Sequence, residues 1–216
     1  MKIYGISGLG ADKRVFDKLT LNAEFIPVDW IEPFKKESIE SYALRLSDKI
    51  DPKEMYGLLG VSFGGLVAVE ISKKLNPALT ILISSVETKN DLSSVLKTVG
   101  KTGLVKYLPA WMFNSPRWLA SYIFGAKNKV LLRNILDDTD LTFTKWAINE
   151  LMKWKNEQKL ERVLKIEGAS DKLIIPTGDE NSKLVDAGGH FMIVDKAEEI
   201  SRLINIELKK IALERK

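Results

Sequence analysis

Short apolar runs alternate with helix-forming segments along most of the chain, and this alternation constrains the fold more than any other feature. The apolar runs predict strands at 2–7, 24–30, 54–62, 79–85, 162–170 and 182–189. The other segments predict helices at 38–50, at 65–76 and from about residue 196 onwards. Because the helices that connect parallel strands cover both faces of a sheet, this order predicts an α/β fold with a mostly parallel, doubly wound sheet.

Single residues add local detail to this prediction. Pro27 has no backbone N–H to donate, so the second strand is expected at an edge of the sheet. Ser38 is a typical N-cap for the first helix, and Asn76 followed by Pro77 is expected to end the second. The run at 79–85 is continuously apolar, which is typical of a strand that is buried on both faces.

The stretch 90–155 interrupts the alternation and lies between two predicted core strands. It favours helix and is rich in aromatic residues: Tyr107, Trp111, Phe113, Trp118, Tyr122, Phe124, Phe143, Trp146 and Trp154. The chain has 216 residues and no repeat or linker, and single α/β domains of about 200–250 residues are common. We therefore expect one domain, 1–216, with 90–155 as a helical insertion.

The composition excludes several kinds of site and partner. The chain has no cysteine, so it has no disulfide, thiolate metal site or cysteine nucleophile. Its single histidine argues against a histidine-rich metal site, and we expect neither a metal nor a cofactor. The net charge of +4 is spread along the chain and nothing resembles a nucleic-acid-binding module, so we expect no nucleic-acid partner.

The hydropathy pattern bears on location. No run approaches the roughly 18–20 apolar residues of a membrane span. The N-terminal stretch lacks the apolar core of roughly 7–15 residues that a signal peptide needs. We therefore expect a cytoplasmic protein with no membrane span.

One serine, Ser62, stands in the pattern G-x-S-x-G, between a predicted strand and a predicted helix. In such a turn the serine takes a strained backbone conformation, and only small side chains fit at Gly60 and Gly64. The N-terminus of the following helix would direct N–H groups towards a developing oxyanion. A glycine-rich turn that binds an anion or only packs is the alternative. A phosphate-binding fingerprint fits poorly, because neither G-x-G-x-x-G nor Lys-Ser/Thr is present.

A serine nucleophile needs a base, and His190 is the only histidine. It follows the strand predicted at 182–189, so it is expected at the same carboxyl edge of the parallel sheet as Ser62. Asp171 follows the strand before it and is the preferred carboxylate to orient the imidazole. Asp179, Asp186 and Glu87 remain alternatives. A structural histidine and a turn aspartate that bonds its own backbone are the simpler interpretations of His190 and Asp171.

An oxyanion hole would need two N–H donors. The N–H of Phe63, directly after the serine, is one candidate, and the N–H of Leu9, in the glycine-rich loop "SGLGAD", is the other. The glycines at 8 and 10 would let this loop approach a substrate closely. A simple turn between strand and helix explains these glycines equally well.

Together these motifs resemble the α/β-hydrolase superfamily. The order Ser62, Asp171, His190 is similar to that family's order of nucleophile, acid and histidine, and the segments "SGLGADKRVF", "GVSFGG", "EGASDKLIIP" and "GGHF" resemble its four site loops. The resemblance extends from residue 2 to about 205. It implies a short core of about six parallel strands, without the family's first two antiparallel strands, and a variable helical lid at 90–155.

The chain also departs from the family pattern. Ser7 stands where many members have a histidine, which bears on how the oxyanion loop is held. A serine nucleophile in place of an aspartate argues against a dehalogenase or an epoxide hydrolase.

The resemblance implies a serine hydrolase that cleaves an ester or thioester through an acyl-enzyme intermediate, without a cofactor. The aromatic insertion and the lack of charged clamps favour a small, mainly apolar substrate. Two alternatives stay open: a carbon–carbon bond hydrolase or lyase on the same scaffold, and a low-turnover ligand-binding protein. The sequence does not predict an oligomeric state.

Overall fold

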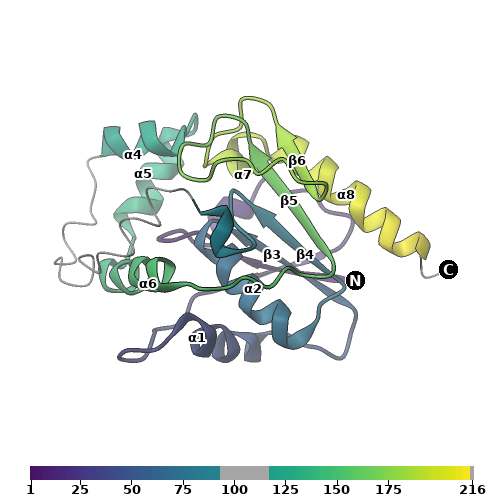
Figure 1. Cartoon of the computed structure of the whole chain (residues 1–216). Helices are drawn as coiled ribbons and strands as arrows, with labels where there is room; N and C mark the ends of the chain where they lie inside the picture. Colours follow the sequence, from purple (N-terminus) through teal and green to yellow (C-terminus); the bar gives the residue numbers. More distant parts are fainter. Residues whose placement is uncertain (93–116, 215–216) are drawn as a thin grey trace.

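A six-stranded parallel sheet forms the centre of the computed structural model, which describes residues 1–92 and 117–214 (Figure 1). The strands are β1 (Lys2–Ile6), β2 (Glu24–Val28), β3 (Tyr56–Val61), β4 (Leu79–Ile83), β5 (Val163–Gly168) and β6 (Ser182–Val185). Their order is β2-β1-β3-β4-β5-β6, and every neighbouring pair is parallel. The predicted fold class is therefore confirmed, and each predicted strand is present.

The strand register brings the carboxyl ends of the strands together. Ile6 at the end of β1 lies beside Gly60 of β3, and Val61 at the end of β3 lies beside Ile83 at the end of β4. Gly168 of β5 lies beside Val185 of β6 in the same way. The loops that follow these strands therefore begin at one edge of the sheet, where α/β folds place their sites.

Helices cover both faces of the sheet. The helices α1 (Ile39–Leu46) and α2 (Phe63–Leu75) pack on one face, in a cluster that includes Tyr42, Leu58 and Leu66. The second cluster includes Ile81, Ile166 and Ile204, and in it helices near both ends of the chain pack on the other face of the sheet. These are η1 (Lys13–Phe16), α7 (Met192–Asp195) and α8 (Ala197–Glu214).

The local predictions about Pro27, Ser38 and Asn76 are confirmed. Pro27 lies in β2, the edge strand. The Ser38 hydroxyl accepts a hydrogen bond from the backbone N–H of Ser41 at the start of α1. Asn76 ends α2 in the left-handed conformation, with φ 45°.

Several elements are shorter than predicted, and the backbone explains why. The strand predicted at 79–85 ends at Ile83, because Ser84 has φ 47° and turns the chain out of the sheet. The strand predicted at 182–189 ends at Val185, because Ala187 has φ 52°. The first helix tightens after Leu46 into the 3₁₀ turn η2 (Ser47–Lys49).

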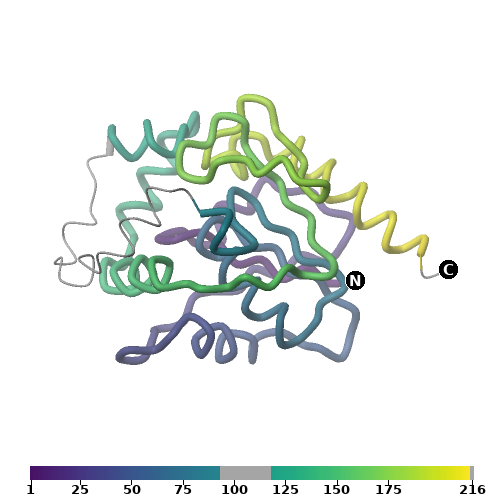
Figure 2. The backbone as a smooth tube through the Cα atoms, viewed as in Figure 1, coloured from purple at the N-terminus to yellow at the C-terminus, as the bar shows by residue number. Residues whose placement is uncertain are grey.

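Three helices, α4 (Arg117–Phe124), α5 (Lys129–Asp137) and α6 (Leu141–Lys153), lie between β4 and β5, after the 3₁₀ turn η3 (Lys89–Asp91). Figure 1 shows them together at the left of the molecule, opposite the start of β1. After α6 the chain runs without regular structure along the molecule and back to β5, as the tube in Figure 2 shows.

The aromatic side chains of the insertion differ in their surroundings. Phe143 packs against Trp30 with ring centroids 5.0 Å apart, and Trp146 packs against Tyr42 at 4.5 Å. Trp154 is buried and donates a hydrogen bond to a buried glutamate of α2. Two others, Trp118 and Tyr122, are exposed. Phe124 lines the cavity that is described below, and three more, Tyr107, Trp111 and Phe113, lie outside the described residues.

Candidate active site

Ser62 forms the corner between β3 and α2. Its backbone has φ 51° and ψ −123°, a strained conformation for a residue other than glycine. A Cβ atom at Gly60 would lie 2.5 Å from the carbonyl oxygen of Gly64, and one at Gly64 would collide with the backbone oxygens of Ile6 and Ser7. The prediction that only small residues fit at 60 and 64 is therefore confirmed.

Hydrogen bonds from neighbouring segments hold this corner. The N–H of Ser62 donates to the carbonyl oxygen of Ile83 at 3.0 Å. The carbonyl oxygen of Ser62 accepts from the N–H of Gly65 at 2.9 Å and from the hydroxyl of Ser85 at 2.7 Å. The role of Ser85 was not predicted from the sequence. The sequence feature that could have indicated it is a pair of serines directly after β4, the strand that lies next to β3.

Ser62, His190 and Asp171 form one hydrogen-bonded chain. His190 Nε2 lies 2.9 Å from Ser62 Oγ, and His190 Nδ1 lies 2.9 Å from Asp171 Oδ2 and 3.1 Å from Oδ1. With the proton on Nδ1, the imidazole donates to Asp171 and accepts from the Ser62 hydroxyl. His190 is 5% exposed and Asp171 8% exposed. The structure therefore brings the three sequence-predicted residues into direct contact.

The surroundings of Asp171 favour its ionised form. Burial alone would raise the pKa of this carboxyl group, but the hydrogen bond and charge of His190 lower it. The backbone N–H groups of Leu173 and Ile174 donate to Oδ1 at 2.9 and 3.0 Å and lower it further. The net pKa lies below the ordinary aspartate value, so Asp171 can hold the imidazole and stabilise its cation.

The three carboxylates that the sequence left as alternatives to Asp171 have different surroundings. Asp179 accepts a 2.7 Å hydrogen bond from the buried ammonium of Lys165. Glu87 is buried and accepts from the N–H of Leu160 at 2.6 Å. Asp186 is exposed. Asp171 is therefore the carboxylate that His190 contacts.

The loop after β1 passes beside Ser62. A Cβ atom at Gly8 would lie 3.4 Å from Ser62 Cβ. The Ser7 hydroxyl donates to the carbonyl oxygen of Ala11 at 2.7 Å. Ser7, which stands where many α/β-hydrolases have a histidine, therefore holds this loop. Leu9 and Phe63 both line the space in front of Ser62. Their backbone N–H groups donate no hydrogen bond to residues 1–92 or 117–214.

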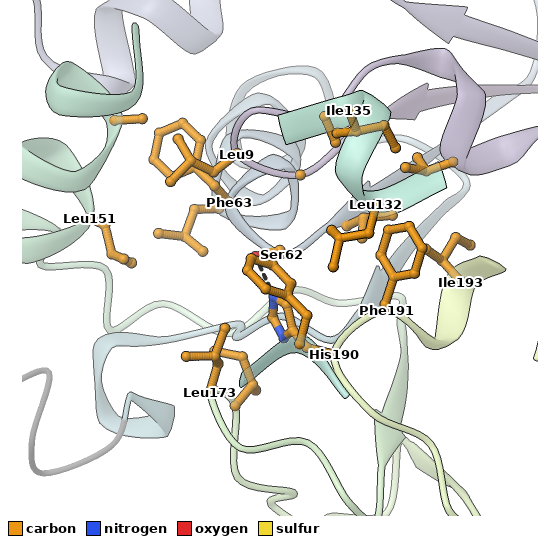
Figure 3. A pocket seen from close by; sticks show the side chains of 18 of the residues that line it. Leu9, Ser62, Phe63, Leu132, Ile135, Leu151, Leu173, His190, Phe191 and Ile193 are labelled. Atoms are coloured by element: carbon orange, nitrogen blue, oxygen red, sulfur yellow. Dashed lines mark hydrogen bonds between the residues drawn. The ribbon is translucent and has the colours of Figure 1, made fainter. Parts of the chain in front are cut away.

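A cavity of about 180 Å³ opens in front of Ser62 and His190 (Figure 3). Among the described residues that line it, only these two have polar side chains. The others are glycine, alanine, valine, leucine, isoleucine and phenylalanine, and they come from the sheet edge, from all three inserted helices and from the histidine loop. The site therefore combines a polar reacting centre with apolar walls.

Hydrogen bonds and a ring contact join the inserted segment to the chain after β6 that carries His190. The carbonyl oxygen of Phe124, at the end of α4, accepts from the N–H of Phe191 at 3.0 Å. The Phe124 ring meets His190 edge-on, with ring centroids 5.4 Å apart. The Asp195 carboxylate, at the end of α7, accepts from the N–H groups of Lys127 and Asn128 at 2.7 and 2.9 Å. From the sequence, Phe124 was predicted only to be one of the aromatic residues of the insertion.

Comparison with known proteins identifies the fold. The sequence matches no protein-family model and no curated protein. The structure is similar to a thermophilic esterase from Thermogutta terrifontis, with 16% identity, a TM-score of 0.73 and coverage of 98% of this chain and 90% of the other. It is also similar to the RedJ thioesterase of Streptomyces coelicolor prodiginine biosynthesis, with 14% identity, a TM-score of 0.66 and coverage of 96% and 90%.

A third similar structure is the meta-cleavage product hydrolase CumD from Pseudomonas fluorescens, with 16% identity, a TM-score of 0.68 and coverage of 100% and 92%. The chain has the α/β-hydrolase fold. The likeness fixes the architecture. The names of these three proteins describe different reactions, so the chemistry of this α/β-hydrolase fold has to be argued from its own site.

The described residues of this α/β-hydrolase fold form neither a metal-binding cluster nor a membrane-spanning helix. No group of three or more histidine, cysteine, aspartate or glutamate side chains in residues 1–92 and 117–214 is arranged to bind a metal ion. No helix in these two segments has the length and apolar character needed to cross a membrane.

Proposed function

We propose that this protein is a serine hydrolase that cleaves an ester or thioester of a small, mainly apolar substrate through an acyl-enzyme intermediate. The observation that carries the proposal is the hydrogen-bonded chain from Ser62 through His190 to Asp171, whose Ser62 and His190 side chains line an apolar cavity. This arrangement suits acyl transfer, because a serine hydroxyl needs an adjacent base and the base needs an orienting carboxylate.

In the first half of the reaction, Ser62 Oγ attacks the acyl carbon while its proton passes to His190 Nε2. Asp171 holds the Nδ1–H of the imidazole and stabilises the positive charge that forms. The N–H groups of Leu9 and Phe63 donate to the oxyanion, and the N-terminus of α2 adds its positive partial charge there. His190 then gives the proton to the leaving group as its bond to the acyl carbon breaks.

In the second half, water attacks the acyl-enzyme. His190 Nε2 takes a proton from this water, and the oxyanion forms again beside Leu9 and Phe63. The bond between Ser62 Oγ and the acyl carbon breaks, and the proton returns from His190 to Ser62. The products are a carboxylic acid and the free enzyme.

The surroundings of the site support an uncharged substrate. None of the described lining residues is an aspartate, glutamate, lysine or arginine. A phosphate or carboxylate near Ser62 would therefore lose hydration without gaining an ion pair. We assign α4, α5 and α6 the role of a lid, because residues from all three line the cavity.

A panel of p-nitrophenyl esters and acyl thioesters tests the proposal. The native protein is expected to hydrolyse uncharged substrates, and Ser62→Ala is expected to lower kcat/KM by roughly four to six orders of magnitude. Ser170→Ala is the matched control, because it removes an exposed hydroxyl beside Asp171 and is expected to retain activity.

Three outcomes would contradict the proposal. Full activity of Ser62→Ala would exclude Ser62 as the nucleophile. Inactivity of the native protein on every ester and thioester would favour carbon–carbon bond hydrolysis, the reaction class that the similarity to CumD raises. Tight ligand binding with negligible turnover would favour a binding protein.

A further inference from the structure

The loop after β1 contains a tight turn that carries Leu9, one of the two proposed oxyanion donors. The N–H of Ala11 donates to the carbonyl oxygen of Gly8 at 3.0 Å, so residues 8–11 form a β-turn. Gly10, the third residue of this turn, has φ 68°, a value that is typical of a type II turn and that glycine adopts readily. The turn therefore decides where the Leu9 N–H points.

A side chain of the insertion holds this turn. The hydroxyl of Thr139, in the segment between α5 and α6, donates to the carbonyl oxygen of Gly10 at 2.9 Å. It also lies 3.0 Å from the carbonyl oxygen of Ile135, four residues earlier, so its single proton is shared between two acceptors. A Cβ atom at Gly10 would lie 2.8 Å from both Oγ1 and Cγ2 of Thr139. Thr139 therefore packs directly on the turn.

Planar peptide units connect this hydrogen bond to Leu9. In a trans peptide unit the C=O and the N–H point in nearly opposite directions. The Gly10 carbonyl, which accepts from Thr139, shares its peptide unit with the N–H of Ala11. That N–H donates to the Gly8 carbonyl, which shares its peptide unit with the N–H of Leu9. These two peptide units form a relay, through which the position of Thr139 fixes the orientation of the Leu9 N–H.

The peptide relay also affects the strength of the Leu9 donor. Hydrogen bonds in a chain polarise one another, so a proton donated to the first carbonyl strengthens the bonds that follow. The hydroxyl of Thr139 thus polarises the N–H of Ala11 and, through it, the N–H of Leu9. Figure 3 shows Leu9 and Phe63, the two proposed donors, on one side of Ser62. An oxyanion formed there gains from a stronger and better oriented Leu9 donor.

The opposite end of the turn is held by the core of the protein. The carbonyl oxygen of Ala11 accepts from the Ser7 hydroxyl at 2.7 Å and from Trp30 Nε1 at 3.1 Å. This carbonyl belongs to the next peptide unit, outside the relay that leads to Leu9. Among the described residues, the side chain that bonds to a carbonyl of the relay is that of Thr139.

We propose that Thr139 is a positioning residue for the oxyanion hole, which orients and polarises the N–H of Leu9 through the turn at residues 8–11. This inference rests on the proposed hydrolase reaction at Ser62 and on the proposed role of Leu9 in it. Thr139 is not among the residues that line the cavity. The insertion therefore has a part in stabilising the oxyanion that is separate from forming the cavity walls.

Substitutions at Thr139 separate the effect of its hydroxyl from that of its shape. Thr139→Val keeps the branched shape and removes the donor. It is expected to lower kcat for p-nitrophenyl butyrate about three- to tenfold, the range that loss of one hydrogen bond accounts for, with a smaller change in KM. Thr139→Ser keeps the hydroxyl and should retain most of the kcat. Thr139→Ala also removes the hydroxyl and should match Thr139→Val, so the test does not depend on one substitution.

A pair of inhibitors tests whether the lost stabilisation is at the oxyanion. Ser62 Oγ adds to the carbonyl carbon of butyl trifluoromethyl ketone as its proton passes to His190, and the carbonyl oxygen becomes an oxyanion. The alcohol formed by reduction of this ketone has nearly the same shape but forms no oxyanion. Thr139→Val should raise the inhibition constant of the ketone by about the factor by which it lowers kcat/KM, and leave that of the alcohol unchanged.

Two neighbouring residues provide matched controls. Thr142→Val makes the same chemical change at an exposed position in the first turn of α6. Asp138→Asn removes the charge of an exposed ion pair with Arg14 of η1, which is a second contact between the insertion and the chain after β1. Because neither substitution removes a hydrogen bond of the peptide relay, both should retain kcat and the inhibition by the ketone.

The dependence of kcat/KM on pH provides a further control. Thr139→Val leaves the contacts of His190 with Ser62 and Asp171 in place. The midpoint of the pH profile should therefore stay where it is in the native protein. A shifted midpoint would show that the substitution acts through His190, which contradicts the inference.

The remaining contrary outcomes are distinguishable. If the native protein hydrolyses the ester and both Thr139→Val and Thr139→Ala behave like Thr142→Val, this inference is wrong and the hydrolase proposal stands. The same conclusion follows if Thr139→Ser loses as much kcat as Thr139→Val, or if Thr139→Val weakens both inhibitors equally. If the native protein neither hydrolyses any ester nor is inhibited by the ketone, the hydrolase proposal is wrong and this inference falls with it.

Discussion

The hydroxyl of Ser85 donates a 2.7 Å hydrogen bond to the backbone carbonyl of Ser62. Ser85 follows β4, the strand beside β3, and its side chain occupies the space that a Cβ atom at Gly65 would need. The end of one strand thus supports the strained turn at the end of its neighbour. We expect this contact to fix the direction in which Ser62 Oγ points.

Removal of the Ser85 hydroxyl is expected to impair the site more than the fold. Ser85→Ala should lower kcat about three- to tenfold, with a smaller change in KM, and destabilise the protein by about 1 kcal/mol. Steady-state kinetics and urea unfolding measure the two effects.

Ser84→Ala is the matched control for Ser85→Ala. The Ser84 hydroxyl is equally buried but finds no hydrogen-bond partner in the described part of the chain. Its removal should therefore leave stability unchanged or raise it slightly. If Ser84→Ala and Ser85→Ala reduce kcat equally, the hydrogen bond to Ser62 does not have the role assigned to it.

The crowding at Gly64 predicts a large loss of stability for Gly64→Ala. The added methyl group would collide with backbone oxygens of β1 and of the residue after it, which cannot move away as a side chain could. The expected cost is about 3 kcal/mol, the upper end of the range typical of overpacking. Urea unfolding measures it.

Gly178→Ala separates steric crowding from backbone strain. Gly178 has φ 64° and nothing within 4 Å of an added Cβ, so alanine there costs only the left-handed conformation, about 1 kcal/mol. An equal or smaller loss for Gly64→Ala would contradict the packing account of the turn.

Asp171→Asn is expected to lower kcat by about three to four orders of magnitude, because asparagine cannot stabilise the protonated imidazole or fix its tautomer in the same way. It should also change the response of stability to acid. The pKa of Asp171 is lowered on folding, so its ionised form stabilises the protein above the ordinary aspartate pKa of about 3.9, and this contribution is lost as the pH falls below that value.

The difference in unfolding free energy between native protein and Asp171→Asn isolates the Asp171 contribution from that of other carboxylates. It should be largest at neutral pH and shrink between about pH 4 and more acidic conditions. A difference that is constant from pH 7 to pH 3 would show that Asp171 is not preferentially ionised in the folded protein.

The pKa of Glu87 changes on folding in the opposite direction to that of Asp171. Burial raises its pKa, and the hydrogen bond from Leu160 and the charge of Lys165 only partly offset this. Ionised Glu87 therefore destabilises the fold, and this penalty develops as the pH rises above the ordinary glutamate pKa of about 4.3. Glu87→Gln, whose amide oxygen can still accept from Leu160, should raise the melting temperature more at pH 7 than at pH 4. A lower melting temperature at pH 7 would refute this.

The sheet and its carboxyl edge could be predicted because their signals are local or topological. Apolar runs mark the strands, and parallel strands share one edge, so Ser62, Asp171 and His190 could be placed together from their positions after strands. The steric demand at Gly60 could be predicted for a similar reason, since the crowding atoms lie only a few residues away.

The walls of the cavity could not be predicted in this way. The sequence shows that 90–155 favours helix and contains many aromatic residues. It does not show that Leu132 and Leu151 face the cavity whereas Trp118 is 74% exposed, because this depends on how the inserted helices pack on the core. The support of Ser62 by Ser85 was missed for the same reason: a contact between neighbouring strand ends has no local pattern.

Labelling with an alkyl fluorophosphonate tests the central claim, that Ser62 is a nucleophile activated by His190 and Asp171, most directly. Intact-mass measurement of the native protein should show one covalent adduct, and peptide mapping should place it on Ser62. The Ser62→Ala protein should remain unmodified. An unmodified native protein, or equal labelling of Ser62→Ala, would contradict the account.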